Sequence, residues 1–194
     1  MTTSGEAFLL GRGSALLGLG TANLITQYIN PYPTFSVGFG AIPQAFNNLF
    51  IIGKAKSAST ASSYIADTLN VQFNGVTSAT YNWCDMFNNG GSTFGGGYST
   101  AQTMIRVSAL WTSFSSNTAG AGTFVLWIPN YSNSNFTKSI WCIGYASDGT
   151  TNGAALGMYG GTLSGTEGPV TSLKFFATSG SQLTAGAYFG LYGA

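Results

Sequence analysis

The chain has 194 residues, which is enough for one domain with a hydrophobic core of ordinary size. Hydrophobic residues make up 44% of it, which argues against a disordered protein, while charged residues make up only 6%, against about 25% in a typical soluble domain. The net charge is +1 and the six basic residues are scattered, so we do not expect binding to nucleic acid through a basic patch.

The first 33 residues differ from the rest of the chain and predict an extended arm. Their leucines alternate with glycines, which oppose a helix, and Pro31 and Pro33 then impose an extended backbone. The stretch "FLLGRGSALLGLG" is interrupted by Arg12 and by glycines, so it resembles neither a secretory leader nor a membrane span. We therefore expect an arm at residues 1–33 and a compact domain at residues 34–194.

The apolar side chains of this arm are candidate interface residues. An extended apolar segment can lie across a neighbouring subunit and bury surface at many places, although ordering it costs entropy. The alternative is that the segment packs on its own domain as a first strand pair. The residues expected to contact other subunits are Phe8, Leu9, Leu10, Leu16, Leu17, Leu19 and Ile25.

From about residue 42 onward, segments with the alternation or apolar runs of β-strands follow one another. In "DTLNVQFNG" the apolar residues occupy every second position, and Asn74-Gly75 then indicates a tight turn. Nine segments have such patterns, and none shows the sustained periodicity of a helix. They are residues 47–57, 67–75, 77–87, 102–111, 122–130, 138–147, 154–162, 170–180 and 185–194.

Nine strands joined by polar, glycine-rich turns predict an all-β fold, an antiparallel two-sheet sandwich or jelly roll with an extended N-terminal arm. Two glycine-rich stretches, at residues 87–100 and 145–169, are interpreted as irregular loops or as backbone packed against another chain. The strands lack the lysines that usually protect exposed sheet edges. We therefore expect the edges to be covered by the arm or by neighbouring subunits.

The residue types needed for catalysis are scarce. The chain has no histidine, so a Ser-His-Asp or Cys-His arrangement is impossible, and four ligands for zinc are not available. A calcium site in "DGTTNG" would have Asp148 as its only carboxylate. Each acid is adjacent to turn residues or a strand start, where local hydrogen bonding is its expected role: Glu6, Asp67, Asp85, Asp148 and Glu167. We expect no catalytic residues, no metal and no cofactor, with an acid-pair hydrolase as the weakest alternative.

Two further features leave alternatives open. Cys84 and Cys142 could form one disulfide or be two small buried side chains. Several aromatic and amide side chains could form a sugar-binding platform, although aromatic residues in strands more often belong to a core. The residues of this possible platform are Trp127, Asn130, Tyr131, Asn135, Trp141 and Tyr145.

Several segments recur in a fixed order between residues 42 and 194. They are "IPQAFNNLFIIGKAKS", "ADTLNVQFNG", "FVLWIPNYS", "SIWCIGY" and the closing hairpin "PVTSLKFFATSGSQLTAGAYFGLYGA". Together they resemble structural proteins from the virions of tailed bacteriophages, including those of cyanobacterial viruses. The closing hairpin is the most specific of these segments, and the resemblance does not extend to the arm.

This resemblance implies a non-enzymatic jelly-roll protein of the virion. Such proteins act as capsid cement or decoration on the outside of the shell and are often trimers that staple neighbouring shell subunits. The implied partners are the major capsid protein and copies of the chain itself, with no nucleic acid and no membrane. The implied location is the capsid surface, after synthesis in the host cytoplasm. Similar domains occur in tails and fibres, so binding of a host receptor or glycan is the alternative function.

Overall fold

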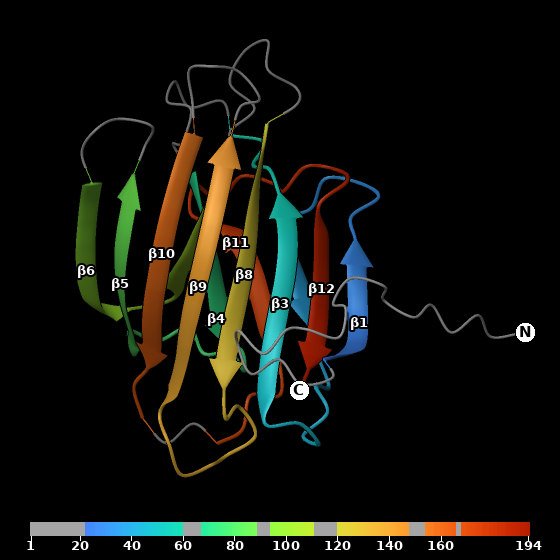
Figure 1. Ribbon diagram of the computed structural model, residues 1–194, viewed down its shortest axis with the longest axis vertical. Coiled ribbons are helices and arrows are strands. Elements are labelled where there is room, and N and C mark those ends of the chain that lie inside the picture. The colour runs from blue at the N-terminus through green and yellow to red at the C-terminus, as the bar shows by residue number, and fades with distance from the viewer. Residues whose placement is uncertain (1–21, 60–66, 89–93, 111–119, 148–153, 166–167) are drawn as a thin grey trace, which may run out of the picture.

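The computed structural model describes residues 22–59, 67–88, 94–110, 120–147, 154–165 and 168–194. Within these ranges the protein contains strands and no helix, and the strands form two antiparallel sheets packed face to face (Figure 1). The strands are β1 (Asn23–Ile29), β2 (Ser36–Phe39), β3 (Asn48–Ala55), β4 (Asp67–Phe73), β5 (Tyr81–Asn88), β6 (Phe94–Gln102), β7 (Ile105–Leu110), β8 (Ala121–Pro129), β9 (Lys138–Ser147), β10 (Ala154–Leu163), β11 (Leu173–Ala177) and β12 (Tyr188–Gly193).

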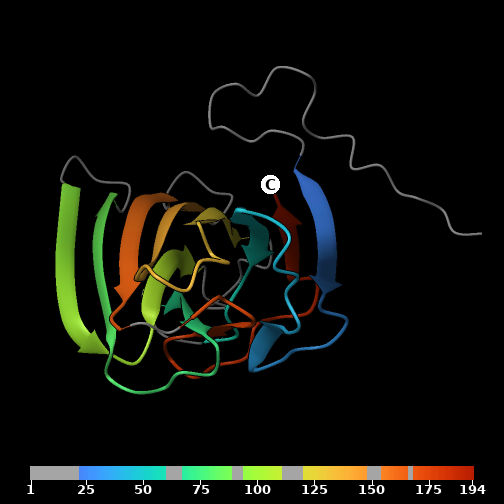
Figure 2. The same ribbon diagram turned by 90° about the horizontal axis from the view of Figure 1, so that it is seen from below.

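The two sheets differ in width. The large sheet has eight strands in the order β1-β12-β3-β8-β9-β10-β5-β6, and the small sheet has four in the order β2-β11-β4-β7. Figure 2 shows the two layers in cross-section, with β1 at one end of the large sheet and β5 and β6 at the other. The small sheet covers one face of the large sheet, and β7 lies across β8, β9 and β10.

The strand order is that of a jelly roll with two inserted pairs of strands. Strands β1-β12-β3-β8 in one sheet and β2-β11-β4-β7 in the other form the eight-stranded nested arrangement, with the chain passing repeatedly between the sheets. The pair β5 and β6 is inserted between β4 and β7, and the pair β9 and β10 between β8 and β11. All four inserted strands extend the large sheet, which explains why it is twice as wide as the small sheet.

All nine predicted strand segments are strands, and the all-β sandwich prediction is confirmed. Of three further strands, β2 and β6 were not predicted, and β1 lies in the segment for which packing on its own domain as a first strand pair was the alternative. The interpretation of residues 87–100 as a loop is wrong for its described parts, because residues 87–88 end β5 and residues 94–100 belong to β6. In the second glycine-rich stretch, β10 is likewise a full strand. Part of the segment assigned to the arm, residues 23–29, is β1, which pairs with β12.

The core lies between the sheets and is rich in aromatic rings. Phe175 of the small sheet packs between Phe124 and Phe189 of the large sheet, with ring centres 6.1 Å and 5.3 Å apart. Two strand glycines make this close packing possible. A Cβ atom at Gly53 would lie 2.4 Å from the ring of Phe124, and one at Gly161 would lie 2.4 Å from the side chain of Ile105. These glycines are therefore required by the close approach of facing side chains.

The buried carboxylate of Asp67 links two connections of the fold to the start of β4. It accepts hydrogen bonds from the hydroxyl of Ser57 at 2.5 Å and from that of Ser179 at 2.6 Å. The backbone N–H groups of Thr68 and Ser179 also donate to it, each at 3.0 Å. Ser57 follows β3 and Ser179 follows β11, so one acidic side chain, 1% exposed, joins both segments to the start of β4. Asp67 thus has a structural role at one end of the sandwich.

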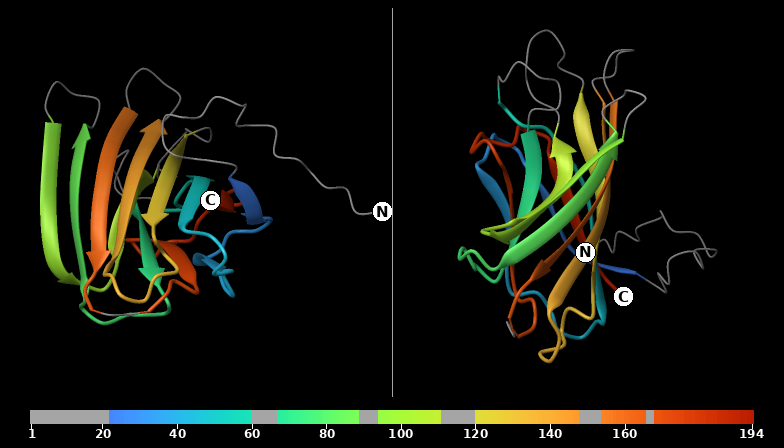
Figure 3. Two further views of the ribbon diagram at one scale, coloured as in Figure 1. Left: turned by 60° about the horizontal axis from the view of Figure 1, so that its bottom comes forward. Right: turned by 90° about the vertical axis from the view of Figure 1, so that its left-hand side faces the viewer.

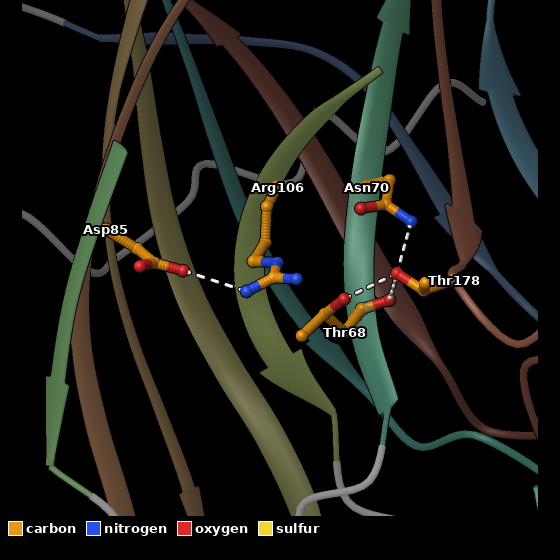
Figure 4. Close-up of polar contacts among 5 residues, drawn as sticks. All are labelled: Thr68, Asn70, Asp85, Arg106 and Thr178. Atoms are coloured by element: carbon orange, nitrogen blue, oxygen red, sulfur yellow. Dashed lines mark hydrogen bonds and ion pairs between the residues drawn. The ribbon is translucent and has the colours of Figure 1, made fainter. Parts of the chain in front are cut away.

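A second acidic residue, Asp85, joins the two sheets where the small sheet ends (Figure 4). Arg106 on β7 donates to the carboxylate of Asp85 on β5 at 3.0 Å, and its guanidinium lies 4.4 Å from the centre of the Trp83 ring. Because the side chain of Asp85 is only 2% exposed, removing Arg106 would leave a buried charge without its partner.

A second polar contact shown in Figure 4 lies on the neighbouring β4, where Asn70 donates to the hydroxyl of Thr178 at 2.7 Å.

We predict that Asp67→Ala lowers the free energy of unfolding by about 3 kcal/mol, because four donors lose their buried acceptor. Asp67→Asn should cost less, since one amide oxygen still accepts hydrogen bonds. Urea denaturation followed by tryptophan fluorescence measures both, with Asn135→Ala in an exposed turn as the control. Equal stability of wild type and Asp67→Ala would contradict the linking role of this carboxylate.

A candidate protein-binding face

The face of the large sheet that points away from the small sheet, here called the outer face, carries three continuous rows of side chains. The rows run across the strands, because paired residues in an antiparallel sheet point to the same side. Figure 3 shows how the strands of the large sheet lie side by side. The first row is Tyr192, Phe50, Trp127, Trp141, Cys84 and Tyr98; the second is Ile52, Val125, Ile143, Met158 and Met86; the third is Tyr188, Lys54, Thr123, Tyr145 and Leu156.

This outer face is apolar over almost its whole width. A sheet with one face on the core normally presents polar side chains to solvent on the other. Here Lys54 is the only charged residue at the outward positions of the described strands of the large sheet. Tyr98 is 81% exposed, Met86 52% and Leu156 50%. The strands therefore combine an apolar core side with an apolar solvent side, which explains runs such as "LFII" and "FVLWI" in the sequence.

A groove of about 460 Å³ lies between the second and third rows. Its lining includes Thr123 and Val125 on β8 and the glycines Gly53 and Gly144 on the two adjacent strands. Leu156 and the aromatic rings of Tyr145 and Tyr188 contribute to its walls, and Lys54 supplies a single cation. The groove offers apolar surface with two phenols, one hydroxyl and one ammonium group. This donor set favours binding of an apolar surface over acid–base chemistry.

The tyrosines of β12 form a polar pair at the side of the outer face. The hydroxyls of Tyr188 and Tyr192 lie 3.2 Å apart and share a hydrogen bond across Gly190, where a Cβ atom would collide with both rings. Burial raises the pKa of Tyr192 to about 12, and the hydrogen bond and charge of Tyr188 add to the shift. The phenol of Tyr192 is therefore neutral under ordinary conditions and adds no charge to the outer face.

The structure describes only one of the candidate arm residues. Ile25 lies on β1 and packs partly buried against the hydrophobic core of its own domain. The others, Phe8, Leu9, Leu10, Leu16, Leu17 and Leu19, lie outside the described residues. Contact of the arm with other subunits stays a prediction.

The possible sugar-binding residues are divided between the outer face and other places. Trp127, Trp141 and Tyr145 point outward in the rows. Tyr131 is buried in the core, and its hydroxyl donates to the carbonyl oxygen of Pro43. The exposed Asn130 and Asn135 lie in the turn between β8 and β9. The aromatic part of the platform is thus present on the outer face, without the amides that were expected to accompany it.

The cysteines and the other ionisable groups take separate positions. Cys84 is exposed on the outer face and Cys142 is buried on the core side of the same sheet, so both are free thiols. Asp67 and Asp85 bind different partners, as described above. Lys138 is buried, donates to the carbonyl oxygen of Asn133, and has its pKa lowered by burial. Glu6, Asp148 and Glu167 lie outside the described residues.

Comparison with protein-family models, with curated proteins and with solved structures finds no match to this chain. In the part of the chain that the structure describes, no three histidine, cysteine or acidic residues gather as metal ligands would. None of the described residues forms a helix that could cross a membrane. Functional inference therefore rests on the outer face itself and on the sequence resemblance given above.

We predict that Tyr192 titrates two pH units above the ordinary value of 10 and that Tyr188→Phe lowers its pKa towards that value. Because the folded chain holds this proton more tightly than the unfolded chain, the associated stability is complete below pH 10 and is lost as the pH rises to about 12. Ultraviolet absorbance of tyrosinate measures the titration, with Tyr192→Phe to assign it. A pKa of Tyr192 at the ordinary value of 10 would contradict the pairing.

We further predict that one thiol per native chain reacts with an aromatic disulfide reagent and that two react after unfolding. Cys84 is exposed, whereas Cys142 is buried and burial raises its pKa well above the ordinary value, which suppresses the reactive thiolate. Cys84→Ser should abolish the native reaction, and Cys142→Ser should leave it unchanged. Protection of Cys84 in the isolated protein would indicate that the outer face is already covered.

Proposed function

We propose that this chain is a non-enzymatic structural protein of a virion, a cement protein that binds the capsid through the outer face and stabilises the shell. The contiguous, nearly uncharged apolar surface of the large sheet carries the proposal. Exposed apolar patches of this kind mark sites of protein association in soluble proteins. The virion and the trimeric state enter through the sequence resemblance to phage structural proteins.

The composition of the outer face supports a protein partner. The centres of protein interfaces are enriched in tryptophan, tyrosine, phenylalanine and methionine and depleted in lysine and acidic residues. The three rows contain those enriched residue types and one lysine, Lys54. Association through such a surface is little screened by salt, whereas ion pairs weaken as the ionic strength rises. A shell component that must stay bound in changing media benefits from this property.

The size of the outer face also fits. With strands about 4.8 Å apart and residues on one face about 6.8 Å apart along each strand, the seven strands and three rows cover roughly 700 Å². One side of an interface of standard size buries about 800 Å². A single partner, such as the major capsid protein, could therefore cover the rows almost completely.

The groove between the second and third rows favours a second candidate function, binding of a host receptor or glycan by a tail or fibre domain. Its walls contain Tyr145 and Tyr188, and aromatic rings pack well against the apolar faces of sugars. A glycan array probed with wild type and with Tyr145→Ala would identify this function by a loss of signal in the variant. The cement proposal expects no glycan signal in either.

We predict that Ile143→Asp weakens binding to shells assembled without this protein by roughly tenfold or more, because it places a charge at the centre of the outer face. The exposed Phe136 lies in a turn outside the sheet, so Phe136→Asp is the matched control and should bind like wild type. Co-sedimentation with shells measures the affinity, and raising the salt from about 0.1 M to about 1 M should change wild-type binding little. Absence of the chain from purified particles would contradict the proposal.

A further inference from the structure

Strand β6 ends the large sheet with an unpaired edge. In the described residues it pairs only with β5, so the backbone groups of residues 94–98 that point away from β5 form an open edge, here called the β6 edge. An exposed edge of this kind is a template for another strand. Phe94 and Tyr98, which flank it on the outer face, are 68% and 81% exposed.

The other sheet edges carry features that oppose strand addition, whereas the bulge of β6 lies at its C-terminal end and leaves residues 94–98 regular. Strand β2 has only four residues, β7 contains Arg106, and β1 has a register shift between Leu24 and Thr26. Short strands, charges and bulges all discourage pairing. None of the nine residues of β6 is charged or is proline.

The open part of β6 has a sharp limit at its C-terminal end. The ladder between β5 and β6 shifts register between Tyr81 and Trp83, and Ala101 takes a positive φ of 52°. The N–H of Ala101 donates to the side chain of Asn82 at 3.2 Å. This bulge ends the regular edge, so the stretch available for pairing is "FGGGYS", residues 94–99.

We propose that the β6 edge binds the β6 edge of a second copy of this chain, antiparallel and around a two-fold axis at Gly96. The sequence Phe94-Gly-Gly-Gly-Tyr98 is nearly symmetric about Gly96, and a two-fold contact requires a surface that is complementary to itself. In this register Phe94 of each copy lies opposite Tyr98 of the other, and the glycines lie opposite one another.

This pairing buries the exposed rings without bringing like charges together. Each two-fold contact contains the Phe94–Tyr98 pair twice, and cross-strand aromatic pairs stabilise antiparallel sheets. The glycines between them leave the two backbones free to approach, and the symmetry of the stretch about Gly96 favours a second copy as the partner. The two eight-stranded sheets then join into one, and the outer faces become continuous. The contact is independent of the virion role proposed above.

Disulfide trapping tests the register directly. Cys84 is first replaced by serine, because it lies opposite Tyr98 within the same sheet. Phe94→Cys and Tyr98→Cys proteins are then oxidised separately and as an equal mixture. We expect a disulfide-linked dimer in the mixture only. In the proposed register residue 94 of one copy lies opposite residue 98 of the other, whereas the two residues 94 lie far apart, as do the two residues 98. Cross-linking of either protein alone, or none in the mixture, would overturn the proposed register.

Sedimentation equilibrium tests the surface without relying on disulfide geometry. Tyr98→Lys should raise the dissociation constant of the self-associated form by roughly tenfold, since it replaces a ring in both pairs. Tyr145→Lys makes the same change at the centre of the outer face and should leave that constant unaltered. An unchanged constant for Tyr98→Lys and a raised constant for Tyr145→Lys would overturn the β6 contact while leaving the cement proposal intact. A wild-type protein that never self-associates would also overturn the β6 contact.

Discussion

The organisation of this protein follows from one constraint on its large sheet. The strands of this sheet are apolar on both faces, and the small sheet covers only one of those faces. Residues such as Leu49, Leu126 and Phe189 fill the core, while Met86, Trp127 and Ile143 on the same sheet point to the other side and remain exposed. Burial of the first set stabilises the domain, and burial of the second set requires another molecule. The hydrophobic effect that holds the sandwich together is the same interaction that we propose for its assembly.

Much of the fold could be predicted because most strands carry strong local patterns. Strands β4 and β11 alternate cleanly, and β3, β8 and β9 are apolar runs of strand length bounded by turn residues. Strands β2 and β6 were not predicted, and β1 was expected only as an alternative, for physical reasons. β6 contains three consecutive glycines, which have low strand propensity by themselves and are strands here because β5 pairs with them. β2 is too short for a pattern, and β1 depends on its ladder with β12.

The candidate site was less predictable than the fold. An apolar run indicates that both faces of a strand are apolar, but only the side on which the small sheet packs decides which face remains uncovered. Trp127, Trp141 and Tyr145 were recognised as possible surface aromatics, whereas Met86, Met158 and Leu156 gave no indication before their register was known. Gly161, which lies in a stretch interpreted as irregular, and Gly53, which lies in a predicted strand, are explained by the side chains of Ile105 and Phe124 that pack against them. The link between Asp67 and Ser179 joins residues too distant in sequence for any local pattern.

The two inserted strand pairs set the breadth of the surface that the molecule presents. Strands β5, β6, β9 and β10 extend the large sheet beyond the nested eight strands, and they carry Met86, Ile143, Tyr145 and Met158 of the rows. Strands β9 and β10 also pack against β7, so they belong to the core as well as to the outer face. Substitutions at the outward positions of these strands would change which molecule the chain binds, whereas substitutions at their inward positions would change its stability.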